Sequence, residues 1–213
     1  MNWEGAVIWY VSFVISVTVH EAAHALFAML GGDRTAYLGG QVTLNPVPHI
    51  QREPIGMIVL PLLSLYYTNG DWCFGFASTP ISRVWADRNP GRAALMSAAG
   101  PLANLALAAV AFTVLWFVGR PDSDSAQAVQ RIAGTFLVLN LILLMFNLIP
   151  LPPLDGAGIL RGLARPLGRI YSQLDQVPHI GIVTFVLANA LLPELFVPVF
   201  REINGWLPYP YRW

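Results

Sequence analysis

Four segments of the chain are long and apolar enough to cross a lipid bilayer as helices, and they constrain the fold more than any other feature. A helix needs about 20 consecutive apolar residues to span the hydrocarbon core. Segments of that kind lie at about 5–30, 93–118, 132–150 and 180–200. The sequence therefore predicts an all-α integral membrane protein with about four transmembrane helices, in which residues 1–213 form a single membrane-embedded domain.

The composition supports this prediction. Hydrophobic residues make up 55% of the chain and charged residues only 11%, whereas a soluble domain carries about 25% charged residues. The net charge is zero, so no nucleic-acid partner is indicated, and a single cysteine excludes an intramolecular disulfide. We therefore expect a multi-pass protein of a cell membrane, such as the bacterial cytoplasmic membrane, with the lipid bilayer as its surroundings.

Two shorter regions are expected to fold close to the membrane without spanning it. Thr35–Leu38 and Gln41–Leu44 flank a pair of glycines, a pattern typical of a small β-hairpin, which we place near the cytoplasmic face. The apolar region 55–77 is divided by the turn signal Thr68–Asp71. Because neither half is long enough to span a bilayer, this region is predicted to be a re-entrant hairpin.

Residues 20–24 read His-Glu-Ala-Ala-His and lie inside the first apolar segment. Two histidines four positions apart share one face of a helix, and Glu21 can act on a water bound between them, as in zinc hydrolases. Ionisable groups at such a depth are costly and usually functional. The motif predicts a site for one zinc ion within the membrane, with His20 and His24 as ligands and Glu21 as the catalytic base.

A catalytic zinc usually takes three protein ligands, so a third must come from elsewhere in the chain. Asp155 follows the helix at 132–150, where prolines stop the helix and Gly156 allows a turn or a close approach of backbone. Taken alone, Asp155 also fits a turn or cap residue. His49 and His179 lie in loop-like contexts and are weaker candidates.

Four motifs together resemble one known family. His20-Glu21-Ala-Ala-His24, followed by Asn147-x-x-Pro-x-Pro-x-x-Asp155-Gly156, resembles the site-2 protease family of intramembrane zinc metalloproteases. Ala99–Asn104 resembles a third segment of that family, and Leu44–Ile50 resembles a stretch of its compact members, which lack appended peptide-binding or nucleotide-sensing domains.

The resemblance implies a role for five residues. It assigns zinc ligation to His20, His24 and Asp155. It assigns the general base to Glu21, and it suggests that Asn147 holds the substrate or the oxyanion. The implied activity is an endopeptidase that cuts peptide bonds within or next to transmembrane segments, in regulated intramembrane proteolysis or the clearance of membrane peptides. Its partner would be a membrane protein or transmembrane peptide as substrate.

Several readings remain open on the sequence alone. Asn147 could simply bond a neighbouring helix, and the small residues before Asn104 could serve helix packing; whether Asn104 or His49 takes part in the site is not decided. Two other functions are compatible with a metal site: an inactive zinc-binding membrane adaptor and an ion transporter. The intact Glu21 argues against the adaptor, and the lack of internal repeats argues against the transporter.

The metal site also constrains the topology. His24 and Asp155 both lie near the C-terminal ends of their helices, so these helices must run in the same direction to bring the two residues together. An odd number of crossings must then separate them. The segment 93–118 supplies one crossing, and 55–77 must supply none or two.

The arginines provide an independent argument. With no net crossing at 55–77, eight of the twelve basic residues lie on one side of the membrane and four on the other. Basic residues favour the cytoplasmic side. We therefore expect both termini outside and the zinc nearer the cytoplasmic face. The arginines predicted to be cytoplasmic are Arg34, Arg52, Arg83, Arg88, Arg92, Arg161, Arg165 and Arg169.

Overall fold

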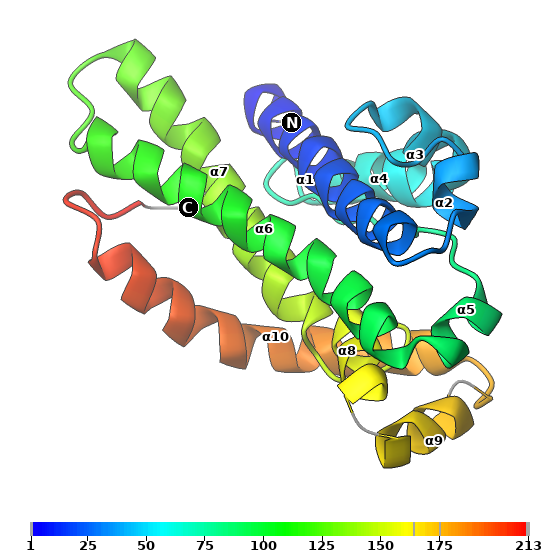
Figure 1. Ribbon diagram of the computed structural model, residues 1–213. Coiled ribbons are helices and arrows are strands. Elements are labelled where there is room, and N and C mark those ends of the chain that lie inside the picture. Colours follow the sequence, from blue (N-terminus) through cyan, green and yellow to red (C-terminus); the bar gives the residue numbers. More distant parts are fainter. Residues whose placement is uncertain (1, 164, 175, 212–213) are drawn as a thin grey trace.

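The computed structural model describes residues 2–163, 165–174 and 176–211, and within these parts of the chain the regular structure is entirely helical (Figure 1). Four helices there are long and apolar enough to cross a membrane. They are α1 (Trp3–Leu30), α6 (Pro90–Val118), α7 (Asp124–Asn147) and α10 (Ile180–Gly205). The four predicted helices are thus confirmed.

Shorter helices fill the connections between the long ones. Among the described residues, five of them lie between α1 and α6, and two lie between α7 and α10. They are α2 (Thr35–Leu38), α3 (Pro46–Arg52), the π-helix η1 (Ile55–Val59), α4 (Leu60–Tyr67), α5 (Arg83–Arg88), α8 (Asp155–Leu163) and α9 (Arg165–Leu174).

Local signals set several ends of the long helices. The side chain of Asn2 accepts a hydrogen bond from the backbone of Gly5 at the start of α1 (3.0 Å), and Ser123 caps α7 by accepting from Ala126 (3.3 Å). The helix α6 ends at Val118 and is followed by Gly119, whose φ of +56° suits glycine. The Ser123 cap explains why α7 begins earlier than the apolar pattern alone predicts.

Side-chain contacts fix the directions of the helices. Glu4 forms an ion pair with Arg131 (2.8 Å), and Ser16 bonds to Asn140 (2.9 Å). Positions therefore advance together along α1 and α7, so the two helices are parallel, while α6 and α10 run the other way (Figure 1). The direction that the metal site requires of the two helices is thus confirmed.

The region 55–77 turns back where the sequence predicts, but it reaches farther than a re-entrant loop. The backbone N–H of Asn2 donates to the carbonyl of Asn69 (2.9 Å), so the turn lies beside the residue that caps the start of α1. Asp71 therefore lies at that end of the bundle. Asp87 lies at the opposite end, in α5, where Trp85 donates to the carbonyl of Gly31 (3.0 Å).

This depth corrects the predicted hairpin, because the chain makes two passages of different structure. The first passage is η1 and α4, and the second is the irregular segment 72–82. The second passage returns from Asn69 beside Asn2 to Thr79 beside Glu21, a separation of roughly 28 Å along α1. About ten residues cover that distance only when nearly fully extended. Two passages still keep α1 and α7 parallel.

The predicted β-hairpin at 35–44 is wrong. Thr35–Leu38 forms α2, one turn of helix, and no strand follows it in this described region. The side chain of Asp33 accepts from the backbone of Thr35 (3.0 Å) and starts the turn. Gly40, with φ of +71°, ends it, and Gln41 donates back to the carbonyl of Ala36 (3.0 Å). The glycine pair is a helix stop and not a strand connection.

The deep hairpin predicts a specific labelling pattern. In a Cys73→Ser background, Asp71→Cys should react with a membrane-impermeant maleimide added to intact cells, as should the control Asp122→Cys in the loop between α6 and α7. Asp87→Cys should react only after permeabilisation, because it lies at the other end of the bundle. Protection of Asp71→Cys equal to that of Asp87→Cys would contradict the two-passage hairpin.

Candidate metal centre

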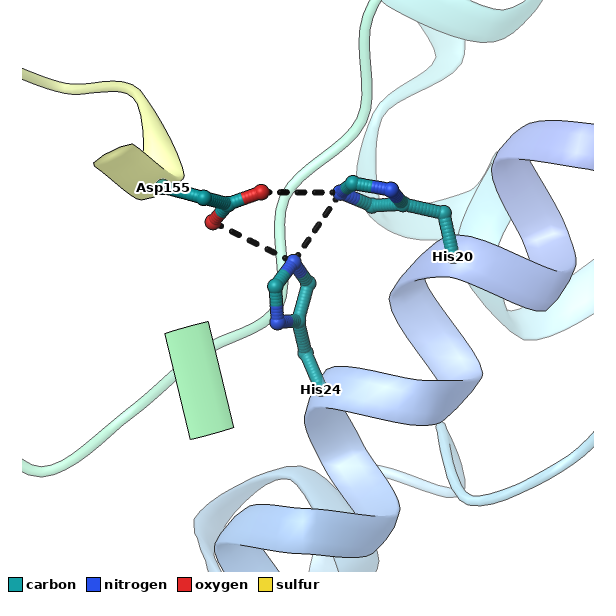
Figure 2. A group of neighbouring side chains, drawn as sticks. All are labelled: His20, His24 and Asp155. Atoms are coloured by element: carbon teal, nitrogen blue, oxygen red, sulfur yellow. Dashed lines mark hydrogen bonds and ion pairs between the residues drawn. The ribbon is translucent and has the colours of Figure 1, made fainter. Parts of the chain in front are cut away.

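Three predicted ligands converge at the C-terminal part of α1. His20 and His24 project from α1, and Asp155, the first residue of α8, faces both of them (Figure 2). Each residue offers one ligand atom, and these atoms lie within 4.8 Å of one another. All three side chains are largely shielded from solvent, with exposed fractions of 7%, 6% and 18% for His20, His24 and Asp155. The fold thus brings together residues separated by more than 130 positions.

A hydrogen bond on the far side of His24 decides which ring nitrogen faces the shared space. Its Nδ1 lies 2.7 Å from the backbone oxygen of Met96. A carbonyl oxygen can only accept, so the proton of a neutral His24 is on Nδ1. The lone pair of Nε2 is then free to bind a metal, an orientation common among metal-ligating histidines.

His20 is oriented in the same way by a chain of buried amides. The backbone oxygen of Phe136 accepts from Asn140 Nδ2 (2.9 Å), which turns the oxygen of Asn140 toward Asn104. Asn104 Nδ2 donates to that oxygen (2.9 Å), and Asn104 Oδ1 faces His20 Nδ1 at 2.5 Å. The proton of a neutral His20 is therefore also on Nδ1. Asn140 additionally donates to Ser16 (2.9 Å), so the chain is anchored on α1 as well.

The resulting cluster of lone pairs fits a cation. The two Nε2 atoms lie 3.0 Å apart, and each faces one oxygen of Asp155, at 3.2 Å from His20 and 3.3 Å from His24. With both protons on Nδ1, no hydrogen stands between these atoms, and their lone pairs repel one another. Two imidazole nitrogens and a carboxylate form a donor set typical of catalytic zinc. The residues therefore fit a zinc ion.

Gly100 of α6 leaves open the space between the histidines. A Cβ atom built on this glycine would lie 2.3 Å from His24 Nε2 and 2.6 Å from His20 Nε2. Any larger residue would thus occupy the position toward which the ligand atoms point. The glycine in the segment 99–104 has a role at the site, beyond the helix packing that small residues permit.

The approach of Asp155 depends on the irregular stretch between α7 and α8. Gly156 lies so close to the end of α7 that a Cβ would be 2.3 Å from the carbonyl oxygen of Leu148, which confirms the expected close backbone approach. Tyr171 of α9 donates to the carbonyl of Pro150 (3.0 Å), and Thr184 of α10 donates to another carbonyl of this stretch. These contacts hold the backbone that carries Asp155.

Glu21 directly follows the candidate ligand His20 in α1 and has a partner that the sequence does not reveal. It is buried, with 5% of its surface exposed, and its Oε2 accepts a hydrogen bond from the hydroxyl of Thr79 (2.7 Å). Thr79 belongs to the extended segment 72–82 and follows Glu21 by 58 positions. No local pattern in the sequence marks it.

The remaining candidates fall into different places. Asn104 contacts His20 directly, which answers the question that its sequence context left open. His49 is buried and lies 3.1 Å from the carbonyl of Thr43, outside the ligand cluster. The side chain of Asn147 donates to the carbonyl of Leu143 one turn earlier (3.0 Å), and its part in substrate binding stays a prediction.

Comparisons with known proteins find relatives that are named as zinc metalloproteases. Residues 119–188 match the sequence profile of peptidase family M50. A Bacillus subtilis (strain 168) protein named "Putative zinc metalloprotease YwhC" is 32% identical over 182 residues, which cover 83% of this chain and 77% of that protein. A Mycobacterium tuberculosis (strain H37Rv) protein named "Putative zinc metalloprotease Rip2" is 32% identical over 200 residues, covering 91% of this chain and 67% of that protein. No solved structure matches the chain.

Gly100 provides a steric test of the metal centre. Gly100→Ala should abolish zinc binding, because the new methyl group would stand between the two Nε2 atoms. Metal analysis of the purified protein should fall from about one zinc ion per chain to near zero. Gly91→Ala is the matched control, since a Cβ there meets nothing within 4 Å in the same helix. Full zinc content in Gly100→Ala would contradict the proposed position of the ion.

A substitution of Asn104 tests whether its contact with His20 supports metal binding. Asn104→Ala should lower zinc affinity roughly 10- to 100-fold, the usual effect of removing a partner that orients a ligating histidine. Zinc titration against a competing chelator measures this change. An affinity within twofold of wild type would show that His20 does not depend on the amide chain.

Proposed function

Because the chain belongs to peptidase family M50, the site-2 protease family of zinc metalloproteases, we propose that it cleaves peptide bonds within or next to transmembrane segments. One observation carries this proposal: three metal-ligand atoms converge, and Glu21 directly follows one of the ligand residues, on a helix that is apolar enough to span a membrane. The substrate would be a membrane protein or a transmembrane peptide.

The residues of the site have complementary roles in this reaction. One zinc ion held by His20, His24 and Asp155 would supply an activated water and polarise the scissile carbonyl. Glu21 accepts a proton from the water as its oxygen forms a bond to the carbonyl carbon. When the carbon–nitrogen bond breaks, Glu21 passes this proton to the leaving amine. We also propose that Asn147 holds the substrate or the oxyanion.

The extended segment 72–82 offers a way to bind an unwound substrate. Hydrogen bonds to the backbone of this segment involve Trp72, Phe74, Phe76 and Ser78, at alternate positions as in a β-strand. These bonds come from the preceding hairpin helices and their flanking residues. The N–H groups of the intervening residues 73, 75, 77 and 79 have no partner among the described residues. Cys73 is buried, so we propose that the later part of this edge, at 77 and 79, pairs with a substrate strand. A helical substrate must unwind to use it, since its own carbonyls are otherwise bonded.

The site is proposed to open toward the cytoplasm. Glu21 lies roughly 14 Å from the C-terminal end of α1 and roughly 27 Å from its start. Arg92 donates to the carbonyl of Gly31 (3.1 Å) at the C-terminal end, where the arginines expected to be cytoplasmic gather. The side chain of Arg165 and residue Arg212, two of the twelve arginines counted on the two sides of the membrane, lie outside the described parts of the chain.

Glu21→Gln tests the proposed chemistry. The variant should bind zinc like wild type but cleave roughly 100- to 10,000-fold more slowly, because it cannot accept the proton from water. The assay follows purified protein acting on a panel of single-span membrane proteins tagged at both ends, with a chelator control. Clients captured by the inactive variant and identified by mass spectrometry supply the panel.

The same experiment separates the alternatives. A zinc-binding adaptor would retain clients without cleaving them in either form, and a transporter would show no chelator-sensitive proteolysis. Cleavage by Glu21→Gln at the wild-type rate would contradict the role of Glu21 as base.

A further inference from the structure

We infer that Thr79 positions the general base, by holding one oxygen of Glu21 and leaving the other to receive the proton. This inference rests on the proposed proteolytic function. The hydroxyl of Thr79 lies 2.7 Å from Glu21 Oε2 and 3.0 Å from the backbone oxygen of Glu21. A hydroxyl has one proton to donate, and the shorter contact, to the side-chain oxygen of Glu21, takes it.

The hydrogen bond from Thr79 gives the two carboxylate oxygens of Glu21 different roles. Within the described residues, the hydrogen bond from Thr79 is the one made to the Glu21 carboxylate, and it engages Oε2. The other oxygen, Oε1, is left for the water that attacks the substrate. A glutamate side chain has several rotatable bonds, so fixing one oxygen removes conformations that place the base out of reach.

Thr79 is itself held in place on both sides. Just before it, Arg52 donates to the carbonyl of Ser78 (3.1 Å), and the hydroxyl of Ser78 donates to Glu53 (2.5 Å). Shortly after it, the backbone N–H of Ser82 donates to Asp33 (2.7 Å). The extended segment therefore presents the Thr79 hydroxyl from a fixed backbone.

Asp33, which accepts the hydrogen bond from Ser82, is charged at neutral pH. Burial raises the pKa of Asp33, but hydrogen bonds from Thr35 and from the backbone of Ser82 outweigh it, and the pKa is lowered overall. A carboxylate accepts both bonds more strongly than a neutral acid would. Its place between α1 and Ser82 links the segment to the helix that carries Glu21.

The role of Thr79 is tested by removing its hydroxyl without changing its shape. Thr79→Val should lower kcat roughly 10- to 100-fold, the usual effect of losing a hydrogen bond to a charged group. KM should stay within about twofold, and zinc content should stay at the wild-type level, because neither the substrate edge nor the ligands change. Thr79→Ser restores the hydroxyl and should recover kcat to within about threefold.

Thr18→Val is the matched control. Thr18 lies on the same helix as Glu21, is 1% exposed, and its hydroxyl has no hydrogen-bond partner in the described parts of the chain. Removing it should leave kcat unchanged. The control therefore separates loss of the specific Thr79 contact from loss of any buried hydroxyl near the site.

Each outcome bears on a distinct claim. With active wild type and inactive Glu21→Gln, a kcat of Thr79→Val within twofold of wild type overturns the positioning role, as does an equal loss in Thr79→Ser. If Thr79→Val melts at a lower temperature than wild type, Thr79→Ala replaces it, and equal kcat values for Thr79→Ala and Thr79→Ser overturn the inference. Failure of the wild type to cleave any client contradicts the proposed function instead.

Discussion

The close contact between α1 and α6 is the constraint on which the site depends. Met96, Gly100 and Asn104 follow one another at intervals of four residues, so they share a face of α6. His24 contacts the first and His20 contacts the last, while the glycine leaves a gap between them. A rotation of either helix would break the contact of His20 or His24 with α6. It would also close the gap that Gly100 leaves between the two rings. The antiparallel register of two helices thus creates the metal-binding geometry.

A chain of buried polar groups extends this constraint to α7. It links His20 to Asn104, then to Asn140, and returns to α1 at Ser16. An interhelical hydrogen bond in a membrane contributes only about 0.6–2 kcal/mol, but an unpaired polar group in hydrocarbon costs several kcal/mol. These buried hydrogen bonds therefore contribute more to the positions of the helices than to the stability of the fold. They fix the registers of three helices relative to the ring of His20, a candidate metal ligand.

The sequence predicts those parts of the site that follow from local spacing. His20 and His24 share a helix face because of the helical period, and the prolines before Asp155 identify where α7 must stop. The error at Thr35–Leu38 has a local cause, since glycines that end a helix also suit a strand connection. The partner of Glu21 was not predictable, because Thr79 is 58 positions away and is placed only by tertiary contacts.

The deep hairpin meets a requirement that helices alone cannot meet. A transmembrane helix uses its own backbone donors and acceptors, so it has none to offer a substrate at the depth of the site. An irregular passage can offer them, but it is stable in a membrane only where protein covers it. Here η1 and α4 satisfy one edge, through contacts such as Phe76 to Gly56 (3.0 Å), while the N–H groups of the other edge have no partner among the described residues. Thr79 lies on this segment, so the proposed substrate edge and the hydrogen bond to Glu21 belong to one stretch of the chain.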